Sequence, residues 1–171
     1  MITDRLDESK IYKISFRKGL TWNPMSLLGV LIRFFAKVKY NHTAILFYLN
    51  GGWLLQEAIE EGVKTTLFEK SHAIKYYSHF IIEEPDFEYN YKFSLQRTSI
   101  IEGKKYDFKG LLFYQLFLNL FGKWYGKAKD GDKRYYCYES VAYVYGIVDA
   151  YKLKPKKINE MFIIIISDTK I

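Results

Sequence analysis

The sequence predicts an α+β domain in which an antiparallel sheet packs against helices, with residues 1–171 forming a single domain. Three observations predict this class. Two runs rich in β-branched and aromatic residues flank Asn50-Gly51, which is a strong hairpin signal. Long apolar runs follow the helix-capping residues Asn23 and Asp107, and the only cysteine, Cys137, begins a third helical pattern. With 49% hydrophobic residues, the chain can bury a sizeable core.

The predicted elements follow one another along the whole chain. They are a strand at Ile11 to Phe16, a helix from Pro24 to Lys37, hairpin strands at His42 to Leu49 and Trp53 to Ile59, a strand around His79 to Glu83, a helix from Phe108 to Phe121, a helix from Cys137 to Val148 and a strand from Phe162 to Ile166. Helix and strand signals are mixed from Tyr89 to Gln96, so both interpretations remain open there. A loop rich in Gly and Lys is expected over 122–132.

The hairpin determines whether His42 has a carboxylate partner. If Asn50-Gly51 is a two-residue turn, Ala44 pairs with Glu57, and His42 and Glu57 share one face of the sheet across the small Ala44. A carboxylate that accepts a hydrogen bond from one ring nitrogen fixes the tautomer, so the other nitrogen can take a proton. The alternative is a strand histidine with an unrelated carboxylate, because a three-residue turn would place Glu57 on the opposite face.

Cys137 lies where a predicted helix begins. The partial positive charge of a helix N-terminus favours thiolate over thiol, which indicates a nucleophile. Val141, Val144 and Val148 follow at helical spacing, so the cysteine is expected on the stripe that packs against the sheet. The alternative is a buried structural cysteine that acts as a small apolar residue.

Four segments together resemble the circularly permuted papain-like hydrolases, a group that includes NlpC-type cell-wall peptidases, YiiX-like proteins and lecithin:retinol acyltransferases. The segments are Tyr40-Asn41-His42-Thr43-Ala44-Ile45, the run from Gln56 to Val63, Gly103-Lys104-Lys105-Tyr106-Asp107-Phe108, and Tyr136-Cys137-Tyr138-Glu139-Ser140-Val141. In that family the histidine strand precedes the cysteine helix and a Glu lies on the next strand. The resemblance covers residues 40–160, and the chain differs from the family at Tyr138, where the family often has Ser.

The resemblance implies a catalytic triad and a reaction. Cys137 would be the nucleophile, His42 its base and Glu57 the residue that orients the imidazole, while Tyr106 would donate a hydrogen bond to the oxyanion. The implied activity is a cysteine peptidase or amidase that acts through a thioester acyl-enzyme. Two alternatives remain: a lipid acyl hydrolase or acyltransferase of the same superfamily, and a non-catalytic binding protein on this fold.

The composition of the chain restricts the classes of binding partner and substrate that we expect. The formal net charge of +7 favours polyanions such as anionic lipid headgroups or acidic polymers. No nucleic-acid partner is expected, because no zinc spacing or Gly-rich phosphate loop accompanies the charge. One cysteine and three scattered histidines predict no metal, and no cofactor is expected. The expected substrate is a peptide or other amide, cell-wall peptide included.

Two further features of the sequence bear on where the protein acts. The N-terminal ten residues lack a basic segment followed by an apolar core, so we expect a cytoplasmic protein. Neither of the two apolar helices reaches the ~18 uninterrupted apolar residues that a membrane span needs. They are expected to be core helices, or helices that lie on a lipid surface.

Overall fold

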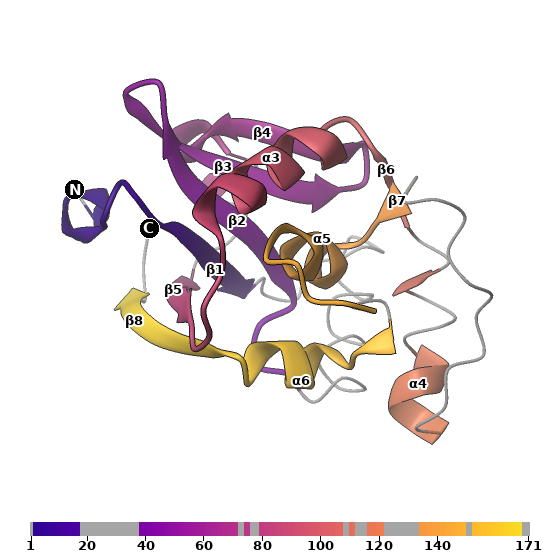
Figure 1. Ribbon diagram of the computed structural model, residues 1–171. Helices are drawn as coiled ribbons and strands as arrows, with labels where there is room; N and C mark the ends of the chain where they lie inside the picture. Colours follow the sequence, from indigo (N-terminus) through magenta and orange to yellow (C-terminus); the bar gives the residue numbers. More distant parts are fainter. Residues whose placement is uncertain are drawn as a thin grey trace.

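The computed structural model describes residues 2–17, 38–71, 74–75, 79–107, 110–111, 116–121, 134–149 and 152–168 (Figure 1). The elements are η1 (Ile2–Arg5), β1 (Ile11–Arg17), β2 (His42–Leu49), β3 (Gly52–Ile59), β4 (Gly62–Leu67), η2 (Phe68–Lys70), β5 (His79–Pro85), α3 (Tyr91–Ile101), β6 (Lys105–Tyr106), α4 (Leu116–Phe121), β7 (Arg134–Tyr135), α5 (Cys137–Val144), α6 (Pro155–Asn159) and β8 (Phe162–Asp168). The predicted helix from Pro24 and the loop over 122–132 lie outside the described residues.

The predicted α+β class with a large antiparallel sheet is confirmed. Six strands form one sheet in the order β4-β3-β2-β1-β5-β8, and every neighbouring pair is antiparallel. The short strands β6 and β7 form a separate parallel pair. The sequence therefore predicted the long strands β1, β2, β3, β5 and β8, whereas β4 was missed.

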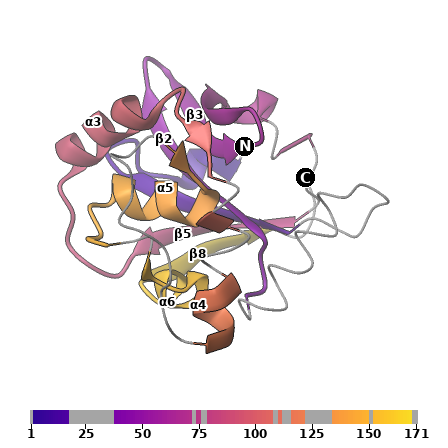
Figure 2. The same cartoon turned by 90° about the vertical axis from the view of Figure 1, so that its right-hand side faces the viewer.

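The sheet buries both of its faces. On one face, Ile45 and Phe47 pack with residues of α3, α5 and α6. On the other, Ala44 and Leu46 pack with Phe16, Phe68 of η2 and other apolar side chains. This alternation follows from the period of two in a strand. The view turned by 90° places α3 and α5 on the same side of the strands (Figure 2).

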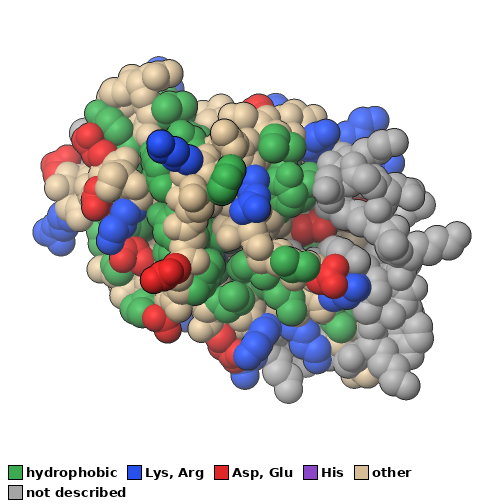
Figure 3. All heavy atoms as spheres, viewed as in Figure 1, with side chains coloured by type: hydrophobic (Ala, Val, Ile, Leu, Met, Phe, Trp, Pro, Cys, Tyr) green, Lys and Arg blue, Asp and Glu red, His purple; other side chains and the backbone are tan. Residues whose placement is uncertain are grey.

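The face that carries α3, α5 and α6 exposes hydrophobic side chains among charged ones of both signs (Figure 3). In the described part of this view the charges are scattered rather than gathered by sign. Among the described helices, none is long and apolar enough to cross a membrane.

Capping residues explain where two helices begin. Asn90 is the N-cap of α3 and its side chain accepts a hydrogen bond from the Phe93 N–H at 3.1 Å, so the ambiguous segment is a helix. Asp107 acts in the same way at the start of the next helical segment, where its Oδ1 accepts from the Gly110 N–H at 2.9 Å. The described parts of that predicted helix are residues 110–111 and α4.

The predicted end of the cysteine helix was wrong. The helix α5 ends at Val144 rather than Val148, and Val148 is 84% exposed. Gly146 adopts a φ of +77°, and the Ile147 N–H donates to the Ala142 carbonyl while the Gly146 N–H donates to the Tyr143 carbonyl. This is the Schellman arrangement that commonly ends helices at a glycine. Of the predicted stripe, Cys137, Val141 and Val144 are buried and Val148 is not, while α5 also buries Tyr138, Glu139, Ser140 and Ala142.

Candidate active site

The hairpin brings His42 and Glu57 together. Asn50 and Gly51 both have positive φ, as a two-residue hairpin turn requires, and they set the predicted register in which Ala44 pairs with Glu57. His42 Nε2 lies 3.1 Å from Glu57 Oε1. The side chains are 8% and 3% exposed, so the hydrogen bond lies in the interior. The predicted contact between them is confirmed.

This contact determines the chemistry available to the imidazole. A carboxylate accepts only, so the shared proton belongs to His42 Nε2 and Nδ1 is the accepting nitrogen of the neutral ring. A buried Glu57 carboxylate also stabilises the imidazolium that forms when Nδ1 takes a proton. The pair can therefore act as a general base with an orienting carboxylate.

His42 and Gln56 lie on opposite faces of the sheet. The His42 ring lies 6.0 Å from the Phe16 ring, centroid to centroid, on the face of Ala44 and Leu46. Gln56 points to the helical face, where its Nε2 donates to the Thr98 carbonyl at 2.8 Å. Gln56 is therefore no substitute for Glu57 at the imidazole.

Cys137 is the first residue of α5. Its side chain is buried with 2% exposure, in the cluster that contains Ile45 and Phe47. The Tyr138 hydroxyl donates to the Tyr40 carbonyl at 3.1 Å, which ties the first turn of α5 to the chain two residues before His42. The helix N-terminus and the beginning of β2 are therefore neighbours, with the helix packed on β2 and β3.

The structure does not join the predicted nucleophile to its predicted base. Within the described residues no hydrogen bond links the Cys137 thiol to His42. The strand alternation gives the reason, because His42 follows the face of Ala44 while Cys137 packs with Ile45 and Phe47 on the other face. Contact between the two groups requires the imidazole to reach around the beginning of β2.

Tyr106 lies on β6, where it pairs with Tyr135 two residues before Cys137. Its side chain is half-buried. The Asp107 N–H donates to the Tyr135 carbonyl at 3.1 Å and so continues this alignment. The backbone thus brings the predicted oxyanion donor close to the start of α5, and its role stays a prediction.

Sequence reasoning quoted the two tyrosines that flank Cys137 but assigned no structural role to them. Tyr136 and Tyr138 are almost wholly buried. Burial is the main cause that raises both pKa values above the usual range, and the nearby Cys137 adds to the effect. Both phenols therefore remain protonated at neutral pH. The aromatic run on both sides of Cys137 was the available signal, but it does not distinguish packing from chemistry.

A second buried polar cluster was also missed. Lys13 Nζ lies 2.6 Å from Glu83 Oε2, and Ser15 Oγ donates to the same oxygen at 2.6 Å. Burial lowers the pKa of Lys13, and the Glu83 carboxylate opposes this shift. The sequence signal was a lysine and a serine, two residues apart, within the otherwise largely apolar strand Ile11 to Phe16.

Within the part of the chain that the structure describes, no group of three His, Cys, Asp or Glu side chains could hold a metal ion. A comparison of the chain with models of known protein families and with curated proteins gave no match.

Proposed function

We propose that the chain is a cysteine-dependent amide hydrolase on a circularly permuted papain-like fold, with Cys137, His42 and Glu57 as its triad. The observation that carries the proposal is the buried hydrogen bond of 3.1 Å between His42 and Glu57. The contact between Tyr138 and Tyr40 brings the chain that leads into His42 to the first turn of α5, whose first residue is the only cysteine of the chain.

The reaction begins with the transfer of the Cys137 thiol proton to His42 Nδ1. The thiolate attacks the carbonyl carbon of an amide, and the oxyanion accepts hydrogen bonds from the Cys137 N–H and the Tyr106 hydroxyl. The His42 imidazolium returns the proton to the leaving amine, which yields a thioester. Water then loses a proton to His42 and attacks the thioester, which releases the carboxylic acid and restores the thiol.

This mechanism requires a local movement. The His42 side chain must turn its Nδ1 toward Cys137 while Nε2 keeps its hydrogen bond to Glu57. The contact between Tyr138 and the Tyr40 carbonyl supports such an approach, because it holds the first turn of α5 beside the chain that leads into His42. Catalytic contacts are often longer in the absence of substrate.

The test is the pH dependence of Cys137 alkylation by iodoacetamide. A thiolate paired with His42 at a helix N-terminus should titrate well below the ~8.5 of a free thiol. His42→Ala should move the midpoint upward. His79→Ala is the matched control, because His79 is an exposed histidine on β5, and it should leave the midpoint unchanged.

Two outcomes would contradict the proposal. One is a native protein whose Cys137 does not react; the other is a midpoint near that of a free thiol in the parent and the His42→Ala variant alike. With a reactive Cys137 established, turnover of peptide amides is the expected activity. Turnover of ester lipids in vesicles without amide turnover would assign the same chemistry to lipid acyl transfer instead.

A further inference from the structure

A cavity of about 450 Å³ lies at the turn end of the β2–β3 hairpin, away from His42. Four residues of the N-terminal segment, the hairpin turn with its flanking residues, and the segment at the start of η2 line it: Thr3, Asp4, Leu6, Glu8, Tyr48, Gly51, Gly52, Trp53, Leu67, Phe68 and Glu69. Tyr48 follows His42 by six positions along β2, which corresponds to roughly 20 Å in an extended strand. The cavity is therefore separate from the candidate active site.

Aromatic rings form one wall of this cavity. The rings of Tyr48 and Trp53 meet edge to face, with centroids 5.5 Å apart and an interplanar angle of 64°. Tyr12 supports Trp53 from the sheet, with centroids 5.9 Å apart. Phe68 also lines the cavity and is itself 7% exposed. The wall thus consists of large rings held by packing.

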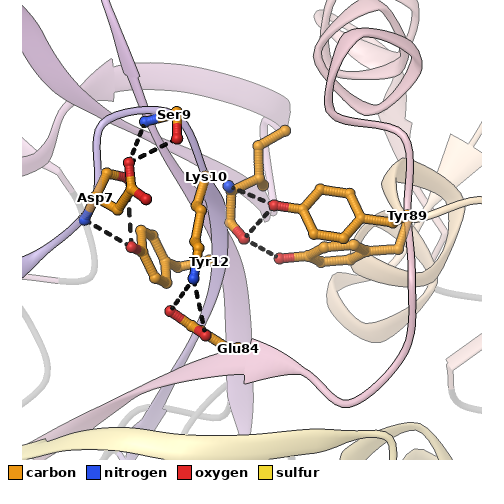
Figure 4. Close-up of polar contacts among 8 residues, drawn as sticks. Asp7, Ser9, Lys10, Tyr12, Glu84 and Tyr89 are labelled. Atoms are coloured by element: carbon orange, nitrogen blue, oxygen red, sulfur yellow. Dashed lines mark hydrogen bonds and ion pairs between the residues drawn. The ribbon is translucent and has the colours of Figure 1, made fainter.

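A hydrogen-bonded turn holds the opposite wall in place. The Asp7 N–H donates to the Tyr12 hydroxyl at 2.8 Å, and Asp7 Oδ1 accepts from both the N–H and the hydroxyl of Ser9 (Figure 4). Leu6 packs into the core from the same segment. This turn fixes the segment that carries Thr3, Asp4 and Glu8 along the cavity.

The charged side chains that line the cavity have the opposite sign to the net charge of the chain. The chain carries a net charge of +7, yet Asp4, Glu8 and Glu69 line the cavity. Of the described residues that line it, none is Lys or Arg. Arg5 and Lys70 are sequence neighbours of Asp4 and Glu69 but do not line the cavity, and Lys10 is paired with Glu84 at 3.3 Å (Figure 4).

We propose that this cavity binds a quaternary ammonium group. Carboxylates attract the positive charge, and the faces of Trp and Tyr bind weakly hydrated cations through the ring quadrupole. Water hydrates a primary ammonium strongly, whereas methylation reduces that hydration and adds apolar surface for the rings. The group could belong to a free choline-type molecule or to a trimethylated lysine of a polypeptide.

The test uses choline and its neutral isostere 3,3-dimethylbutan-1-ol at constant ionic strength. The two molecules have the same shape and differ in charge. The readout is the NMR signal of the Trp53 indole N–H, assigned by its loss in Trp53→Phe. Choline should shift this signal saturably, and the alcohol should bind at least several-fold more weakly. A trimethyllysine peptide and its unmethylated form, measured in the same way, distinguish the polypeptide source from the free one.

Variants separate the aromatic and the charged contributions. Trp53→Leu should raise the Kd for choline by about 2- to 30-fold, the range expected when a cation–π contact is lost. Glu69→Gln should raise it by about 1.5- to 5-fold, as expected for an exposed charge, and added salt should weaken that effect. Glu160→Gln is the control, because it removes the same charge from α6 on the other face of the sheet.

Equal affinity for the alcohol and choline would overturn the proposal, and so would the lack of a saturable shift. An unchanged Kd in Glu69→Gln together with Glu8→Gln would overturn it as well. These two exposed positions keep the test valid even if Trp53→Leu does not fold. A reactive or unreactive Cys137 has no bearing on any of these outcomes.

Discussion

Lys13 and Glu83 form an ion pair inside the sheet, and removal of one partner is expected to be strongly destabilising. The Lys13 side chain has no exposed area and Glu83 has 5%. The substitution Lys13→Met keeps most of the apolar stem but leaves the Glu83 carboxylate with the Ser15 hydroxyl as its remaining described partner. An uncompensated buried charge of this kind costs about 3–5 kcal/mol.

The chain supplies a matched control three residues away. Lys10 and Glu84 make the same type of pair between the residue before β1 and β5, but the nitrogen–oxygen distance is 3.3 Å and the side chains are 46% and 31% exposed. Lys10→Met should therefore cost only about 0–1 kcal/mol. In a domain of this size each kcal/mol changes Tm by about 2–4 °C. We expect Tm to fall by about 6–20 °C for Lys13→Met and by less than about 4 °C for Lys10→Met.

The assay is urea unfolding followed by tryptophan fluorescence, which gives the free energy of unfolding for each variant. The double variant Lys13→Met/Glu83→Leu should recover part of the loss, because no buried charge remains. The reasoning is refuted if Lys13→Met and Lys10→Met cost the same. It is also refuted if the double variant is as unstable as the sum of the two single variants.

Three further predictions follow from the described contacts. Glu57→Gln should leave the fold intact and lower kcat on an amide substrate by about 10- to 100-fold; unchanged kcat with unchanged Cys137 alkylation would exclude Glu57 from the site. Burial raises the pKa of Tyr136, Tyr138 and Tyr145, so these phenols stay protonated in the folded protein above pH 10 while they ionise in the unfolded chain. Their contribution to the free energy of unfolding is therefore present below pH 10 and is lost as the pH rises above it. Unfolding followed by circular dichroism and tyrosine ionisation followed by phenolate absorbance should occur in the same transition. Two separate transitions would refute this. Gly62→Ala should lower the free energy of unfolding by about 1–3 kcal/mol, because Gly62 has a φ of +122° and an added Cβ would lie 2.7 Å from the Lys104 carbonyl oxygen. Gly103 also has a positive φ, but an added Cβ there would meet no atom within 4 Å, so Gly103→Ala should be less destabilising. An equal loss in both variants would show that the positive φ alone is responsible.

Local signals predicted the hairpin in full, because the register depends on two turn residues and on the period of a strand. The turn at Asn50 and Gly51 fixed the partner of every residue up to Ala44, and with it the contact between His42 and Glu57. The beginning of the cysteine helix at Cys137 was also predicted. Its end was not, because Gly146 was not recognised as the residue that ends it.

Non-local features were the ones that the sequence did not reveal. The pairing of Lys13 with Glu83 joins residues 70 positions apart, and no local pattern specifies it. The strand β4 was missed because Lys and Thr residues interrupt its apolar alternation. Its second residue, Val63, ends the segment from Gln56 to Val63 that carries part of the family resemblance. The relation between Cys137 and His42 likewise depends on how α5 packs across the sheet rather than on either segment alone.

The buried pair also bears on how the chain folds. A two-residue turn connects the strands of the hairpin, whereas β1 pairs with β5 across about seventy residues. Pairing over such a long sequence separation is expected to be slow. If β5 slipped by one residue, the Glu83 carboxylate would face the apolar side of Tyr12, Ile14 and Phe16 instead of Lys13. In that register neither charge would have the partner that it has in the fold. The ion pair between Lys13 and Glu83 therefore favours the register of β1 on β5 that the fold has over a register shifted by one residue.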